Sequence, residues 1–146
     1  MPGAPLTGQD YLLQIAPDVS GAPGTYIDIG RTRAKSLKRS VSLIDVSSDY
    51  DPDFEANIPG MRSWSIDGEA INIYDDAGQV ALETAHASKV PYWFKIKPVG
   101  TALTGQRTHT GQGWVTDLSE STQTNQAVTT TFSVRGNGAL TTAVAV

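Results

Sequence analysis

Apolar and polar side chains alternate along most of this chain, and a period of two is typical of half-buried β-strands. The alternation is clearest within residues 61–74, where Trp64, Ile66 and Gly68 share one face and Ser63, Ser65 and Asp67 share the other. The pattern predicts seven strands, within residues 11–15, 26–29, 33–46, 61–74, 92–97, 106–118 and 123–135.

The predicted strand at residues 33–46 is irregular. Leu37, Val41 and Leu43 occupy odd positions, whereas Ile44 and Val46 fall on the other face. A β-bulge or a change of environment near Leu43 would account for the switch.

One short helix is predicted between Asp76 and Val90-Pro91, where the period changes. Asp76 is a suitable N-cap, with Gln79 at the third helical position. Pro91 ends the helix. Small, apolar and hydroxyl side chains recur at helical spacing in between: Ala77, Val80, Ala81, Thr84 and Ala85.

These elements predict a mainly β protein, an antiparallel β-sandwich or small barrel with one α-helix packed outside. Residues 47–60 form a long polar inter-strand loop in this scheme. With 146 residues and no linker or repeat, residues 1–146 are expected to form a single domain. We expect residues 1–9 and 139–146 to be flexible termini that become ordered on assembly.

Composition excludes several classes of protein. The chain has no cysteine, which excludes disulfide scaffolds, Cys-ligated zinc and thiol catalysis. No apolar run approaches the ~20 residues that cross a bilayer, and the first residues lack the pattern of a signal peptide. We therefore expect no membrane partner and retention in the compartment of synthesis. The net charge of −4 argues against a free-standing nucleic-acid binder.

Candidate catalytic and metal-binding motifs are weak. His86 and His109 are the two histidines, and no nucleophile motif frames either of them. The acidic residues 49–55 resemble the start of a calcium loop, but Phe54 replaces the required glycine and Gly60 the bidentate glutamate. We therefore expect no catalytic residue, no metal and no cofactor.

The tryptophans admit two interpretations. Each lies in an alternating strand, which predicts burial, so the expected core includes Trp64, Ile66, Trp93, Trp114 and Phe132. Alternatively, three exposed tryptophans could form a sugar-stacking platform.

The charge pattern is more distinctive. Five basic residues are followed directly by an acidic stretch: Arg31, Arg33, Lys35, Lys38 and Arg39, then Asp45, Asp49, Asp51, Asp53 and Glu55. They could be two solvated patches, or the basic run could bind nucleic acid. In a head-to-tail assembly, the basic strand of one copy could contact the acidic loop of the next. On this last interpretation the interface residues are Arg31, Arg33, Lys35, Lys38, Arg39, Asp49, Asp51, Asp53 and Glu55.

The order of several segments resembles the major tail proteins of long-tailed phages, which are tail tube subunits. The resemblance rests on Asp10-Tyr11-Leu12-Leu13-Gln14-Ile15, Ile44-Asp45-Val46-Ser47-Ser48 and Arg62-Ser63-Trp64-Ser65, and it covers most of the chain. Residues 49–59 depart from the family in their proline and acid content.

The resemblance implies a structural, non-enzymatic virion protein, assembled in the host cytoplasm. It implies hexameric rings whose strands join into an inner barrel and which stack into a hollow tube for the genome. The loop at residues 47–60 and the termini would contact other subunits. Other partners would be tape measure, distal tail and terminator proteins, and DNA would pass without specific binding. Related tubes occur in contractile tails, gene transfer agents and type VI secretion.

Two other functions compete with this one. A carbohydrate-binding β-sandwich module of a phage or bacterial surface protein would use Trp64, Trp93 or Trp114. A hydrolase would use His86 or His109.

Overall fold

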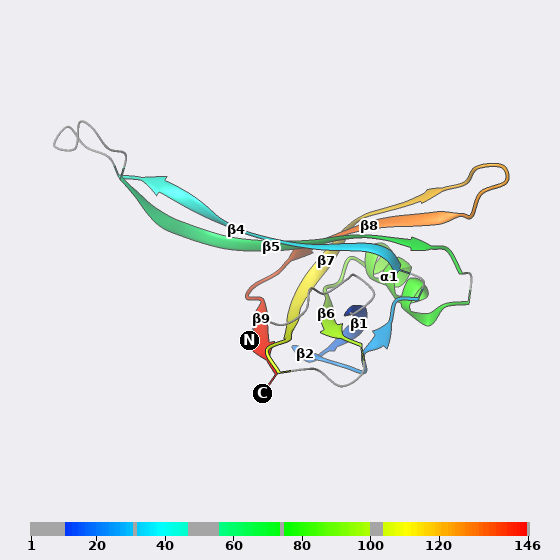
Figure 1. The fold of residues 1–146 in the computed structure, drawn as a ribbon, viewed down its shortest axis with the longest axis horizontal. Helices are drawn as coiled ribbons and strands as arrows, with labels where there is room; N and C mark the ends of the chain where they lie inside the picture. Colours follow the sequence, from blue (N-terminus) through cyan, green and yellow to red (C-terminus); the bar gives the residue numbers. More distant parts are fainter. Residues whose placement is uncertain (1–10, 31, 47–55, 74, 100–103, 146) are drawn as a thin grey trace.

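The computed structural model describes residues 11–30, 32–46, 56–73, 75–99 and 104–145, and the side chain of Arg33 is not described. One helix and nine strands are found in these residues (Figure 1). They are β1 (Tyr11–Val19), β2 (Ala22–Pro23), β3 (Ile27–Asp28), β4 (Thr32–Asp45), β5 (Asn57–Ile71), α1 (Ala77–Ser88), β6 (Tyr92–Pro98), β7 (Arg107–Ser121), β8 (Thr129–Gly136) and β9 (Thr141–Val144).

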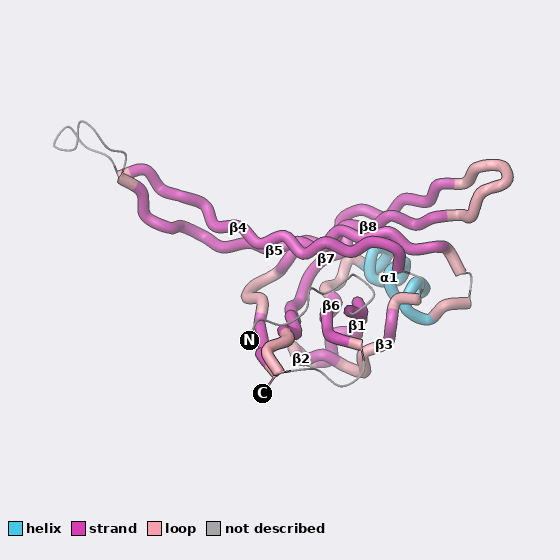
Figure 2. Tube along the Cα trace, in the orientation of Figure 1, coloured by secondary structure: helices cyan, strands magenta, loops and turns pink. Residues whose placement is uncertain are grey.

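The strands form one antiparallel sheet in the order β2-β1-β6-β7-β8-β5-β4, with β3 beside β1 and β9 beside β7. At one end the sheet curls, and its strands β1, β2, β3 and β6 form a compact part with α1 that we call the body. The β4–β5 and β7–β8 hairpins project from the body (Figure 2). The predicted mainly β, antiparallel class with one helix is confirmed. Of the two predicted forms, a β-sandwich or a small barrel, the structure takes the barrel-like one, a single sheet curled into a half-barrel.

The core lies between the curled sheet and α1. On β5, Trp64, Ile66 and Ala70 are buried, so the predicted alternation is confirmed there. Phe132 of β8 is fully buried above Gly68, where a Cβ would overlap its ring. Helix α1 contacts β7, β1 and β3 and contributes Leu82 and Ala85 to the same cluster.

The start of α1 is fixed by two side chains. Asp76 caps the helix as predicted, because its Oδ2 accepts from the Gln79 N–H at 3.0 Å and from the Gly30 N–H at 3.1 Å. The buried Gln79 amide donates to the carbonyls of Gly30 and Ile71 and accepts from the Ile73 N–H. These bonds join the helix to the end of β5 and to the segment after β3.

Several predicted boundaries were wrong. β5 begins at Asn57, so the last residues of the predicted loop belong to a strand. β8 begins at Thr129, after a turn at residues 124–126. At the C-terminus, residues 141–144 form β9 against β7 within the same chain, whereas the sequence predicts that residues 139–146 become ordered only on assembly. Residues 1–9 lie outside the described part.

Candidate assembly surfaces

An arm extends from the body where β4 and β5 continue beyond the core (Figure 1). We define it as residues 41–46 and 56–62. The ladder pairs Leu43 with Pro59 and Ile44 with Ile58. At its far end, the Val46 N–H donates to the Ala56 carbonyl at 2.9 Å. The sequence predicted the irregularity within it, since the register shifts between Val41 and Leu43.

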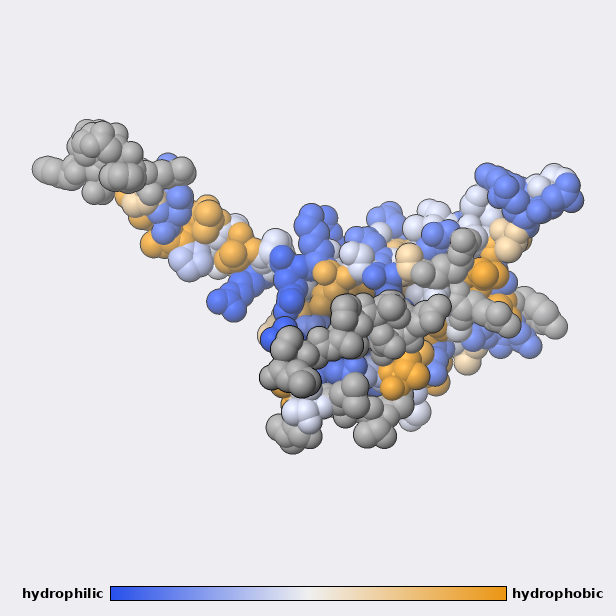
Figure 3. All heavy atoms as spheres, viewed as in Figure 1, coloured by the Kyte–Doolittle hydropathy of each residue, from blue (hydrophilic) through white to orange (hydrophobic). Residues whose placement is uncertain are grey.

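The arm is apolar on both of its faces. Leu43 and Ile44 are consecutive in an extended strand, so their side chains point to opposite faces, and they are 64% and 50% exposed. Met61 is 85% exposed. Figure 3 shows hydrophobic surface along the arm. Soluble monomers rarely leave such a surface uncovered, so the arm is suited to contacts with other chains.

The predicted basic run is divided by the pleat of β4. Lys35 lies opposite Gly68 and Arg39 opposite Trp64, on the core side of the sheet, whereas Lys38 lies opposite Ser65 on the other side. Burial lowers the pKa of Lys35. Arg31 and the acidic residues Asp49, Asp51, Asp53 and Glu55 lie outside the described residues, as does the side chain of Arg33. The five basic residues are therefore not one continuous patch.

A groove lies at the base of the arm, between β4–β5 and residues 136–142. Its volume is about 890 Å³, and its lining includes Arg39 and Arg62 together with Val41, Met61 and Leu140. No aspartate or glutamate is among the described residues that line it. We call this feature the basal groove. Sequence reasoning missed Arg62 here, because it lies far from the basic run in sequence.

His109 lies beside the basal groove. Its Nδ1 is 2.9 Å from the hydroxyl of Thr142, a groove residue. Burial lowers the pKa of His109, and the positive charges of Arg39 and Arg107 lower it further. Two arginines, Arg39 and Arg107, thus act on one site of a chain whose net charge is −4.

The face of the sheet turned away from the body carries mainly hydroxyl groups. Side chains of a strand alternate between its two faces. Because Trp64 and Ile66 point into the core, Ser63 and Ser65 point away from it. We define this hydroxyl face by the residues that share it through strand pairing: Ser36, Ser40, Ser63, Ser65, Ser119, Thr131 and Ser133. Trp114 shares this face as well, because it lies opposite Arg135. The described charged residues on the face are Lys38, Arg135, Asp67, Glu69 and Asp117, so its charges nearly balance.

The sheet under the hydroxyl face is open at two edges. Among the described residues, β4 pairs only with β5, and residues 114–121 of β7 pair only with β8. Exposed edges carry backbone groups that can pair with another chain. The strand order β7-β8-β5-β4 therefore presents two unpartnered edges on opposite sides of one four-stranded segment.

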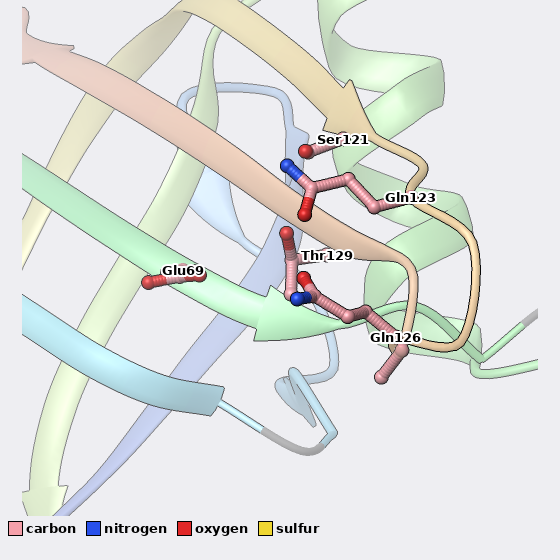
Figure 4. A pocket seen from close by; sticks show the side chains of 6 residues that line it. Glu69, Ser121, Gln123, Gln126 and Thr129 are labelled. Atoms are coloured by element: carbon pink, nitrogen blue, oxygen red, sulfur yellow. The ribbon is translucent and has the colours of Figure 1, made fainter.

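A polar pocket of about 500 Å³ lies near the end of the β7–β8 hairpin. Ser121, Gln123, Gln126 and Thr129 gather there, and Glu69 lies on neighbouring β5 (Figure 4). Among the described residues that line this pocket there is one carboxylate and no histidine.

The described residues provide few other groups suited to catalysis or metal binding. The described residues contain no group of three or more side chains that could hold a metal ion. His86 is exposed on α1, separate from His109 on β7. Within the described part of the chain, no helix is long and apolar enough to pass through a bilayer.

The tryptophans do not share one surface. Trp64 is buried in the core, as are Ile66 and Phe132. Trp93 is half-buried, and its Nε1 donates to Asp18 at 2.9 Å. The prediction that Trp114 lies in the core was wrong: its side chain is 38% exposed, because it points to the same side as its partner Arg135.

The fold is similar to several solved tail tubes. The tail of an empty gene transfer agent particle, with C6 symmetry, matches with a TM-score of 0.76 at 20% identity, over 94% of this chain and 98% of that one. The SPP1 tail tube matches with a TM-score of 0.78 at 17% identity, over 97% and 81%. The sheath–tube complex of an extracellular contractile injection system matches with a TM-score of 0.67 at 12% identity, over 96% and 92%. These likenesses show the fold.

The sequence comparisons address the family. A search of curated proteins gave no match. The family model described as "Phage tail tube protein" matches residues 5–142, nearly the whole chain. The chain therefore belongs to the phage tail tube protein family.

Proposed function

We propose that this chain is a non-enzymatic tail tube subunit, six copies of which close into a ring, and that the rings stack into a hollow conduit for a phage or phage-like genome. The observation that carries the proposal is the four-stranded segment with two open edges. Joining β4 of one copy to residues 114–121 of β7 in the next removes both edges. Such a contact joins two different surfaces, and it closes when the rotation between copies divides a full turn. The C6 symmetry of the similar gene transfer agent tail supports a ring of six.

In such a ring the hydroxyl face lines the channel. A closed barrel has one inner and one outer side, and the body covers the face that carries Trp64 and Ile66. Six bodies fit outside the barrel, which leaves Ser63 and Ser65 facing inward. Small neutral hydroxyl groups and nearly balanced charges give DNA phosphates few fixed cations to bind, which favours passage over retention.

The arm supplies contacts between copies in this proposal. Its Leu43, Ile44 and Met61, which are 64%, 50% and 85% exposed in the lone chain, become buried against neighbouring subunits. Burying the exposed part of each side chain contributes about 1–2.5 kcal/mol. The predicted interface of Arg31, Arg33, Lys35 and Arg39 with Asp49, Asp51, Asp53 and Glu55 belongs to the same contacts between subunits, whereas Lys38, which was also predicted to lie there, faces the channel from the hydroxyl face. The ends of the tube would meet tape measure, distal tail and terminator proteins in the virion.

Cross-linking tests the ring directly, because the chain has no cysteine of its own. The double variant Ser36→Cys/Ser119→Cys carries one cysteine on β4 and one on β7, the two strands with open edges. A flexible bis-maleimide applied to the assembled double variant should give a ladder on a denaturing gel that ends at six subunits. Either single variant should give dimers at most.

Two outcomes would contradict the proposal. Assembled double variant that yields no ladder would show that these edges do not meet. A ladder that continues past six would indicate an open filament in place of a closed ring.

A further inference from the structure

The basal groove concentrates positive charge and exposed apolar surface at one place. Arg39 projects into it from β4 and Arg62 from β5, and Arg107 acts electrostatically on the adjacent His109. Val41 and Met61 add apolar area to the same lining. A groove of this kind fits an extended segment that carries carboxylates beside apolar side chains.

We infer that the basal groove is the socket for the acidic segment, residues 47–55, of a second copy of this chain. The inference rests on the proposed function, since it assigns one contact between tube subunits. It also assigns different roles to the basic residues of β4. Arg39 binds the acidic segment together with Arg62, whereas Lys38 lies on the opposite face of β4 and does not.

Charge complementarity identifies the occupant. Residues 47–55 contain Asp49, Asp51, Asp53 and Glu55, and they also contain Tyr50 and Phe54. The segment thus carries four carboxylates for the guanidinium groups and two aromatic rings for the apolar lining. Arginine pairs with carboxylates through two parallel hydrogen bonds, so it favours this type of ligand.

The position of the segment points to another copy as its source. It starts and ends at the far end of the arm, where Val46 bonds to Ala56. Seven strand residues, about 23 Å at 3.3 Å each, separate Arg39 from Val46. A nine-residue segment with its ends held together extends about 15 Å at most, half its contour length. The basal groove of a second copy is reached without folding back along the arm.

A charge-reversal series tests the contact. Arg39→Glu with Arg62→Glu should raise the critical concentration for tube assembly at least about tenfold, because repulsion replaces attraction at every copy. Asp51→Lys with Asp53→Lys should have a similar effect. A chain carrying all four substitutions should assemble within about threefold of the wild type, because the pairing is restored with its signs exchanged.

A matched control reverses two cations outside the groove, Lys89→Glu with Lys97→Glu, and should leave the critical concentration within about threefold. Circular dichroism of each variant at low concentration establishes that the monomer is folded. A four-substitution chain that stays as defective as its parents would overturn the inference. Normal tube formation by the Arg39→Glu/Arg62→Glu variant would also overturn the inference, but it would leave the proposed function intact.

Nucleic acid is the competing ligand for a positive groove. Fluorescence anisotropy with a labelled 20-base-pair duplex in 150 mM salt separates the two. No binding by wild-type monomer, or binding that survives Arg39→Glu/Arg62→Glu, fits the inference. Duplex binding that the reversal abolishes, without rescue of assembly in the four-substitution chain, assigns the groove to DNA. A wild-type chain that never forms rings or tubes would contradict the proposed function.

Discussion

Gln79 is the buried polar side chain on which the attachment of α1 depends. It is 8% exposed and makes three hydrogen bonds with backbone groups. Its Nε2 donates to the Gly30 carbonyl at 3.0 Å and to the Ile71 carbonyl at 2.8 Å, and its Oε1 accepts from the Ile73 N–H at 2.9 Å. Replacing Gln79 leaves all three backbone groups without these partners.

The cost of Gln79→Leu follows from these contacts. Each lost bond costs about 1–1.5 kcal/mol when its partner stays out of water, which gives about 3–4.5 kcal/mol for three. The leucine recovers about 1 kcal/mol through added apolar burial. The net loss of unfolding free energy is about 2–3.5 kcal/mol. For a chain of this length, that lowers Tm by about 7–12 °C.

Thermal and urea unfolding, followed by far-UV circular dichroism at a concentration that keeps the chain monomeric, measures this loss. Gln123→Leu, in the exposed turn after β7, is the matched control and should change stability by less than about 0.5 kcal/mol. Gln79→Glu should cost at least as much as leucine, because it removes both donors and places a carboxylate beside two carbonyls. A Gln79→Leu protein as stable as the control would refute the reasoning.

Three further predictions concern packing, pH and the arm. Gly136→Ala should lower the unfolding free energy by about 1–3 kcal/mol, measured by urea titration, because the new Cβ would overlap the Trp64 ring. His109→Gln should flatten the pH dependence of Tm below pH 6.5: the pKa of His109 is lowered in the folded chain, so protonation favours the unfolded chain as pH falls below the ordinary value of 6.5. Leu43→Ser should leave the monomer's Tm within about 2 °C but raise the critical concentration for assembly severalfold in sedimentation assays, since Leu43 is exposed in the lone chain.

Patterns within a few neighbouring residues predicted those parts of the fold that short-range interactions determine. Alternation identified the buried face of β5, and the misplaced pair Leu43 and Ile44 predicted the irregularity in β4. The N-cap role of Asp76 followed from its own side chain and its spacing to Gln79. In each case the cause lies within a few residues of the effect.

The features that the sequence did not predict depend on which other parts of the molecule pack against or pair with a strand. Alternation places Trp114 on one face of β7, but it does not tell whether that face is packed, and here it is partly exposed. The apolar residues of the arm follow a pattern like that of core strands, although Leu43 and Met61 are 64% and 85% exposed. β9 was missed because its order comes from pairing with distant residues of β7.

The central claim is that six copies of the chain close into rings that stack as a tube. Cryo-electron microscopy of the purified protein over a concentration series tests it most directly, with a seeded sample in which preformed tube ends supply any missing initiator. We predict hollow tubes whose cross-sections have sixfold symmetry and whose channel is lined by the face that carries Ser63 and Ser65. Protein that stays monomeric at high concentration and with seeds, or tubes whose channel is lined by the opposite face of β5, would contradict the account.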